Sequence, residues 1–200
     1  MKNRHGFMFV LGIAALAFGI TVLGCDNGTT DTTGDTVSPG ETVNQPGTVS
    51  NTGGGTLTFT HYRKWASGET EYDPLAGAGL GNVTVNTDGT FTLTLGTPNG
   101  SVLETVPQGE INASPFDTKF FGIADFTTTD GSTSGKMLSL KKGVQQVAYL
   151  YADKDATLSG GFITDSVKVS KGWNMLIQDN SAQRVFAGPV DGFTWVIEDY

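Results

Sequence analysis

The sequence of 200 residues carries 12 basic and 20 acidic side chains, a formal net charge of −8 at pH 7. Phosphate groups repel an acidic chain, so we expect no nucleic-acid partner and no electrostatic attraction to anionic lipid. The length suits a single domain with its own core, and the single cysteine, Cys25, excludes an intrachain disulfide.

The N-terminus has the pattern of an export signal. A short basic stretch, residues 1–5, precedes the uncharged segment 7–24, and small residues stand before Cys25. This order predicts a secretory signal peptide over residues 1–24. The alternative is a membrane-spanning helix, but eighteen residues are at the short limit for a bilayer, and Asp26 follows where basic anchors are usual.

The segment Val22-Leu23-Gly24-Cys25 resembles the lipobox of bacterial prolipoproteins. That family prefers Leu where this chain has Val22. The resemblance implies a diacylglyceryl group, carrying acyl chains such as palmitate, on the Cys25 thiol, and cleavage before Cys25. Cleavage would also remove Lys2 and Arg4, leaving a net charge of −10. The expected location is the bacterial cell envelope, on the periplasmic face or the cell surface, with the membrane as partner through two or three acyl chains.

Residues 26–55 contain no Lys, Arg, aromatic residue, Leu, Ile or Met. A segment of Thr, Gly, Asp, Asn, Ser and Pro cannot bury enough apolar area to offset its chain entropy. We therefore predict a lipidated Cys25 with a flexible tether over residues 25–55, reaching about 30 Å. An irregular edge strand of the folded domain remains the alternative.

Residues 56–200 show short runs of Thr, Val and aromatic residues separated by Gly, Asp, Asn and Pro. No window keeps a helical period of 3.6 residues over three turns. The pattern predicts an all-β domain, an antiparallel β-sandwich of eight to ten short strands, with a β-barrel as the alternative. The expected strands lie at 56–60, 82–86, 90–95, 119–126, 147–152, 166–170, 173–177 and 193–197.

The hairpin over residues 82–95 gives the clearest register. A three-residue loop, 87–89, places Val85 opposite Phe91 and puts all the apolar side chains on one face. It also gives Gly89 the left-handed conformation that such loops need. We expect asparagine at that position to be tolerated better than valine.

The segment 151–160 has the pattern Y-x-D-x-D-x-T-x-x-G, and K-G-W-N follows at residues 171–174. Together they resemble a C-terminal segment of uncharacterised bacterial lipoproteins. The resemblance covers about a quarter of the mature chain. It implies a β-domain of surface or periplasmic type and no known activity.

Three aromatic residues, Tyr62, Trp65 and Tyr72, surround the glycine-containing segment 66–81. An exposed aromatic platform is a common way for a β-sandwich to bind a sugar, and aromatic residues also form the centres of protein interfaces. We predict these three as ligand-binding residues for a glycan or a protein. The alternative is that they pack in the core.

Asp153 and Asp155 have the Asp-x-Asp spacing of calcium ligands, although the residues after them break the order of an EF-hand loop. A solvated turn is the alternative reading. His61 lies at even spacing from Phe59, which predicts a buried and hydrogen-bonded structural histidine. The sequence has no nucleophile elbow, phosphate loop or cofactor fingerprint, so we predict no cofactor.

These features favour a binding or interaction domain displayed on a lipid anchor over an enzyme. Two alternatives stay open: a carboxylate-dependent enzyme that acts on glycans, and a purely structural envelope protein. Two facing carboxylates about 5–10 Å apart in a cleft would favour the enzyme.

Overall fold

The computed structural model describes residues 43–50, 52–65, 72–105, 111–131 and 133–200. The predicted signal peptide, Cys25 and residues 26–42 of the predicted tether lie outside the described residues.

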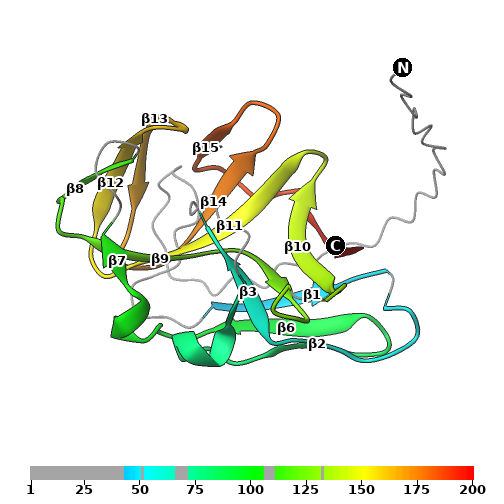
Figure 1. Ribbon diagram of the computed structural model, residues 1–200. Helices are drawn as coiled ribbons and strands as arrows, with labels where there is room; N and C mark the ends of the chain where they lie inside the picture. The colour runs from blue at the N-terminus through cyan, green and yellow to red at the C-terminus, as the bar shows by residue number, and fades with distance from the viewer. Residues whose placement is uncertain (1–42, 51, 66–71, 106–110, 132) are drawn as a thin grey trace, which may run out of the picture. The chain divides into compact units, whose positions relative to one another are not determined.

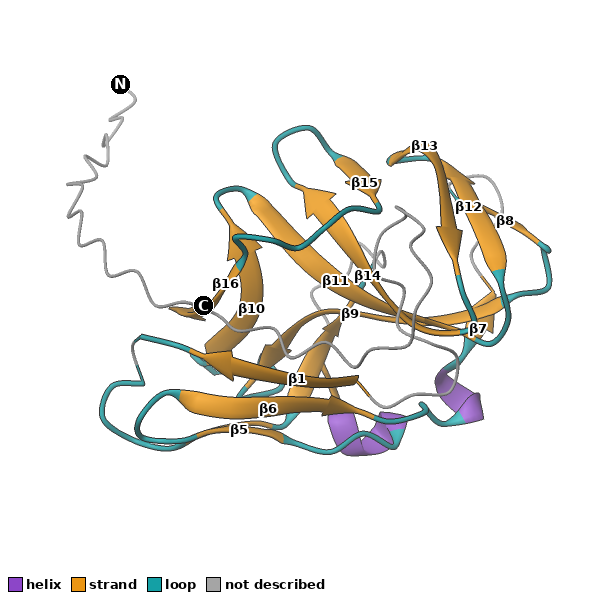
Figure 2. Cartoon of the chain, turned by 180° about the vertical axis from the view of Figure 1, so that it is seen from behind, coloured by secondary structure: helices purple, strands orange, loops and turns teal. Residues whose placement is uncertain are grey.

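The described residues form an all-β sandwich, as predicted (Figure 1). One layer is small and consists of two strand pairs that lie side by side (Figure 2). These pairs are β1 (Val43–Thr48) with β6 (Thr90–Leu95), and β2 (Leu57–Phe59) with β5 (Val83–Val85). The layer packs on a larger, mainly antiparallel sheet, and the sheets do not close into a barrel.

The larger sheet runs in the order β4-β3-β9-β10-β11-β14-β15-β13-β12-β8, with β16 beside β10 and β7 beside β9. Its strands are β3 (His61–Lys64), β4 (Tyr72–Pro74), β7 (Glu104–Thr105), β8 (Asn112–Ser114), β9 (Lys119–Thr127), β10 (Lys136–Lys142), β11 (Gln145–Ala152), β12 (Ala156–Gly160), β13 (Ile163–Val169), β14 (Gly172–Asp179), β15 (Arg184–Phe186) and β16 (Thr194–Asp199). Two 3-10 turns, η1 (Leu75–Ala78) and η2 (Gly100–Val102), complete the described elements. The sixteen strands exceed the predicted eight to ten because several have only two or three residues, too few for a periodic pattern.

Both faces of the larger sheet are buried at its central strands β9, β11 and β14. In β11, Val147 and Tyr149 face the small layer, whereas Ala148 and Leu150 face a second cluster that includes side chains of β12 and β13. Two buried faces explain why β9 and β11 read as continuous apolar runs, and confirm that both are interior strands.

The predicted loop of the 82–95 hairpin is correct. The N–H of Asn86 donates to the carbonyl of Thr90 at 2.9 Å, and Gly89 has a φ of +84°. The apolar residues of β5 and β6 all face the core. The predicted pairing of Val85 with Phe91 is not formed as a ladder among the described residues: β5 pairs with β2, and β6 pairs with β1.

The predicted tether extends too far into the domain. Residues 43–48 form β1, which pairs with β6 from Val43 opposite Leu95 to Thr48 opposite Thr90. Val43 and Val49 are both buried in the core. The edge-strand alternative therefore holds for residues 43–48, and the domain begins at Val43 or earlier instead of at residue 56.

The K-G-W-N segment forms the tight turn into β14. Gly172 has a φ of +99°, and the Asn174 side chain accepts from the N–H of Ser170 and donates to the carbonyls of Ser170 and Gly172. Trp173 donates its indole N–H to the carbonyl of Gly96 at 2.9 Å. The four residues therefore close a turn and fix the end of β6 to the larger sheet.

Candidate functional site

Two of the three predicted ligand-binding aromatics are in the core. Tyr62 is 2% exposed and packs edge-on against Phe121, and Trp65 is 7% exposed and packs edge-on against Phe162. The prediction of an exposed platform is therefore wrong for these two residues. Only Tyr72 is half-buried, and its ring stacks on that of Tyr200 with 5.2 Å between the centroids.

His61 does not share the face of Phe59. The strand β2 ends at Phe59, and the N–H of Thr60 donates to the carbonyl of Thr127 at the end of β9. The chain therefore changes sheets at Thr60, and the alternation of buried and exposed side chains shifts by one residue in β3. Tyr62 takes the buried position instead, and His61 is half-buried. The predicted hydrogen bond of His61 is present, between its Nδ1 and the Thr60 hydroxyl at 2.9 Å.

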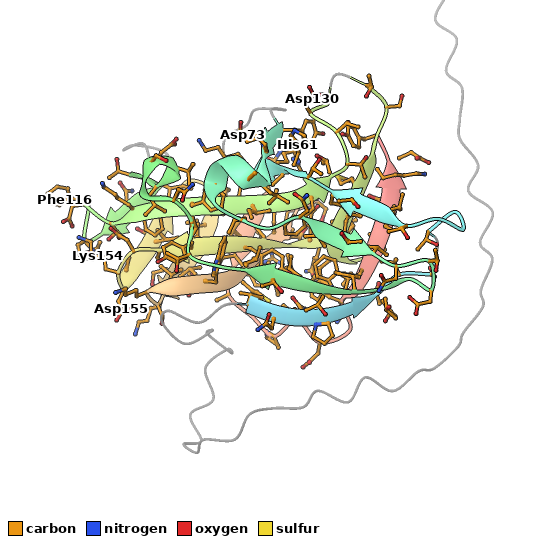
Figure 3. The ribbon with its side chains drawn as sticks, turned by 90° about the horizontal axis from the view of Figure 1, so that it is seen from below. His61, Asp73, Phe116, Asp130, Lys154 and Asp155 are labelled. Atoms are coloured by element: carbon orange, nitrogen blue, oxygen red, sulfur yellow. The ribbon has the colours of Figure 1, made fainter. Side chains whose placement is uncertain are left out.

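The side chains of Asp153 and Asp155 each accept a hydrogen bond from a backbone N–H. Asp153 accepts from the N–H of Lys119 at 2.9 Å, and Asp155 accepts from the N–H of Lys171 at 2.7 Å. Lys154 between them pairs with Asp117. The part of the chain that the structure describes contains no group of three or more potential metal ligands. The hydrogen bonds of Asp153 and Asp155 stabilise turns at one end of the domain, where Figure 3 labels Asp155 and Lys154.

The most distinctive polar feature is an ion pair between Arg63 of β3 and Asp125 of β9. Arg63 is opposite Asp125, but the next residue, Lys64, is opposite Ile123, so Ala124 is the extra residue of a β-bulge. Bulges often redirect side chains next to functional sites. Asp125 Oδ2 accepts from Arg63 Nε at 2.9 Å and also from Arg63 Nη2.

The two charges differ in their access to water. The Asp125 side chain is fully buried, whereas 35% of the Arg63 side chain is exposed. Burial opposes the charge of Arg63, but the hydrogen bonds and negative charge of Asp125 outweigh burial and raise the pKa of Arg63 above its usual value. The pair therefore presents a permanently charged, fixed guanidinium at the surface.

A fork in the sheet surrounds this pair. Here β9 pairs with β11 up to Ile123 and with β10 from Phe126, which leaves the carbonyl of Ala124 without a ladder partner. The Gln146 amide donates to that carbonyl at 2.7 Å and to Asp125 Oδ2 at 3.3 Å. The side chain of Gln146 thus replaces a missing backbone donor.

Two buried polar atoms at the fork have no hydrogen-bond partner among the described residues. They are Asp125 Oδ1 and the hydroxyl of Ser139. Ser139 follows Leu138, which is opposite Phe126 in the last pair that joins β10 to β9. Unsatisfied buried groups cost free energy and are unusual outside sites with a role beyond packing.

Two tyrosines stand beside the ion pair. Tyr72 is the ladder partner of Arg63, so both side chains are on the same face. The Tyr200 hydroxyl lies 2.6 Å from that of Thr129, and a Cβ on Gly131 would overlap the Tyr72 ring. Burial raises the pKa of the Tyr72 hydroxyl, and the charge of Asp125 adds to this effect. We call Arg63, Tyr72, Asp125 and Tyr200 the tyrosine–arginine patch.

Of these four residues, only Tyr72 was predicted from the sequence. One signal was available: Asp125 is a single carboxylate within the apolar run of β9, and a charge in an interior strand needs a partner. Nothing local in the sequence indicates that Arg63 is this partner, or that Tyr200 stacks on Tyr72.

Comparisons of the chain with protein-family models, with curated proteins and with solved structures found no match. Within the described ranges, no helix is both long enough and apolar enough to cross a membrane.

Proposed function

We propose that this chain is a lipoprotein of the bacterial cell envelope that displays a β-sandwich domain for binding a protein partner. The lipobox at residues 22–25 supports the anchor, and the start of β1 at Val43 leaves residues 26–42 as the tether. A flexible segment of that length reaches about 20–25 Å, enough to hold a domain beside a membrane.

The tyrosine–arginine patch is the observation that carries the binding proposal. Tyrosine and arginine are enriched among the residues that dominate protein–protein affinity. Arg63 is fixed by the buried Asp125, and Tyr72 is fixed by Tyr200, so little side-chain entropy would be lost on binding. A partner with a carboxylate or a carbonyl group could accept from the exposed part of the guanidinium.

Photo-crosslinking in living cells tests this proposal. A benzophenone amino acid replaces Tyr72 in one full-length variant and Val144 in another. Val144 is 59% exposed and lies in the β10–β11 turn, so it is a matched surface control. We expect a discrete adduct from position 72 and none from position 144.

Competition then establishes specificity. An excess of the unlabelled chain should remove the adduct, and an excess carrying Tyr200→Ala should remove less of it, because Tyr72 loses its stacking partner. The binding proposal fails if position 72 gives no adduct, or gives the same products as position 144.

A further inference from the structure

One large apolar side chain projects into solvent at the end of the domain where β9 begins. Phe116 is 76% exposed, and Figure 3 shows it beyond the turns that carry Lys154 and Asp155. A single exposed aromatic side chain is common on protein surfaces and does not by itself indicate a partner. The turn that carries Phe116 and the point where the chain enters the domain are the observations that indicate one.

The turn around Phe116 is fixed by its neighbours. Thr118 is buried, and both its hydroxyl and its N–H donate to the carbonyl of Pro115, at 2.7 Å and 3.2 Å. Asp117 forms an ion pair with Lys154 at 2.6 Å. The turn therefore holds Phe116 outward, and little backbone entropy would be lost when its ring is buried against a partner.

The chain enters the described domain toward the same end. Val43, the first residue of β1, is opposite Leu95, and the carbonyl of the next residue, Gly96, accepts from the indole N–H of Trp173. Trp173 lies at the start of β14, beside the last residues of β11, and the turn after β11 contacts the first residue of β9. The strand β1 therefore starts toward the end of the domain that carries Phe116.

The charges in the turns at this end are balanced. Three lysines and three aspartates lie in these turns: Lys119, Lys154, Lys171, Asp117, Asp153 and Asp155. Their formal charges cancel, whereas the whole chain has a net charge of −8. Anionic lipid headgroups repel an acidic surface, so this end meets less repulsion at a membrane than the average surface of the protein.

We propose that this end of the domain docks on the lipid surface that holds the predicted anchor, with the ring of Phe116 at the boundary between headgroups and acyl chains. Aromatic and apolar side chains partition to that depth. One ring would not hold a free protein on a membrane, but a tether over residues 26–42 would keep the domain within about 20–25 Å and raise its effective concentration there. The inference rests on the lipid anchor of the proposed function.

Docking at this end would hold the tyrosine–arginine patch away from the membrane. The strand β9 starts at Lys119, beside the turn of Phe116, and Arg63 is opposite Asp125, further along the same strand. The rise of an extended strand places Asp125 about 20 Å from Lys119. The patch would therefore stay accessible to a protein partner in the aqueous phase.

Fluorescence quenching by brominated lipid tests the docking. The purified lipidated chain is reconstituted into phosphatidylcholine vesicles, with and without bromine on the acyl chains next to the headgroups. Phe116→Trp places a fluorophore at the proposed site. Val144→Trp is the matched control, because Val144 is the other exposed large hydrophobic residue in the described ranges and lies at the opposite end of β11. The signal of the three native tryptophans, measured on the unchanged chain, is subtracted.

The two positions should respond differently. We expect bromine to lower the emission from position 116 at least about twofold and the emission from position 144 by less than about a tenth, because quenching requires contact with the acyl chains. No quenching at position 116, or equal quenching at the two positions, would overturn the inference.

Amine labelling shows whether Phe116 itself is responsible. A water-soluble reagent modifies exposed lysines on the vesicle-bound protein, and mass spectrometry compares Lys119, beside the docked turn, with Lys142, next to Val144; both lysines are exposed. We expect Phe116→Ser to raise labelling of Lys119 about threefold and to leave Lys142 unchanged, because headgroups no longer cover the turn. Equal labelling of Lys119 in the two chains would contradict the role of Phe116.

The same samples separate this inference from the proposed function. A fatty-acid label on Cys25 without quenching at position 116 would refute only the docking. Absence of that label would refute the anchor and the docking together. Quenching at position 116 without an adduct from position 72 would support the docking and refute only the protein-binding proposal.

Discussion

Gly89 is held by its conformation and by its neighbour. Its φ is +84°, as the hairpin loop predicted, and its carbonyl also accepts a hydrogen bond at 3.0 Å from the N–H of Val49, the residue that follows β1. A Cβ on Gly89 would overlap the Val49 carbonyl oxygen. This contact was not predictable from the sequence, because the composition of residues 26–55 favours a tether that includes Val49.

This contact changes the expectation for asparagine at position 89. Both Gly89→Asn and Gly89→Val must displace Val49, so we predict that each lowers the free energy of unfolding by at least about 2 kcal/mol. Gly81→Ala is the control, because nothing lies within 4 Å of its Cβ, and it should cost less than about 0.5 kcal/mol. Denaturation midpoints of the three variants and the unchanged protein measure these losses. A near-normal midpoint for Gly89→Asn would mean that β1 does not lie against the loop.

The two side chains of the Arg63–Asp125 ion pair differ in burial, so replacing one or the other should change the free energy of unfolding by different amounts. Arg63→Met leaves a fully buried carboxylate without its counter-charge, so we predict a loss of about 3–5 kcal/mol in unfolding free energy. Asp125→Asn leaves a guanidinium that water can reach, and we expect a smaller loss of about 1–2 kcal/mol. Lys154→Met, which breaks an exposed pair with Asp117, is the control and should cost under about 1 kcal/mol. Equal losses for the first two variants would contradict the assigned burial.

At the scale of the elements, we expect the stability of the turn after β14 to depend on pH. Hydrogen bonds from the Ser181 hydroxyl at 2.7 Å and the Ala182 N–H at 3.0 Å lower the pKa of Asp179 to about 2. The folded pKa lies below the unfolded value of about 3.9, so the carboxylate stabilises the fold above that value. This stabilisation is lost as the pH falls from about 4 to about 2.

Asp179→Asn should isolate this effect. We predict that the variant melts below the unchanged protein at pH 6 and that the difference narrows as the pH approaches 2. Thermal midpoints across that range supply the measurement. A difference of the same size at both ends would show that the charge of Asp179 is not responsible.

The strand β1 shows where sequence patterns fail. Its sequence includes Pro46 and Gly47 and little apolar surface, so composition favours a tether. In the structure, Gly47 faces inward, where a Cβ would overlap the Phe91 ring, and Pro46 faces outward on an edge strand. The strand β1 forms because β6 has a free edge with which it can pair. Since β6 lies far away in the sequence, the residues of β1 alone do not predict this pairing.

By contrast, β5, β6, β9 and β11 were predictable because their alternation or continuous apolar character follows from burial on one or two faces. The phase change at Thr60 and the pairing of Arg63 with Asp125 depend on which sheet each strand joins. Periodicity within a segment carries no information about that choice.

Limited proteolysis of the purified protein tests whether β1 belongs to the folded domain. We expect a resistant fragment that begins at or before Val43, because residues 43–48 are paired with β6. N-terminal sequencing of the fragment gives the boundary. A fragment that begins after residue 50 would show that β1 detaches from the domain and would restore the longer tether.

At the scale of the whole molecule, the proposed anchor and the proposed binding surface lie in different parts of the sequence. The anchor depends on Cys25, whereas the tyrosine–arginine patch offers a cation and aromatic rings. The two proposed properties should therefore be separable by mutation.

Lipid attachment at Cys25 would hold the whole protein at the membrane, and metabolic labelling with a fatty-acid probe tests for it. Cells expressing the full chain are compared with cells expressing Cys25→Ser, and the labelled protein is followed by size. We predict that the unchanged chain is labelled and shortened by about 24 residues, as the lipobox resemblance implies. The Cys25→Ser chain should carry no label and keep its full length. A Cys25→Ser chain that is processed normally and still partitions into detergent would contradict the lipoprotein account.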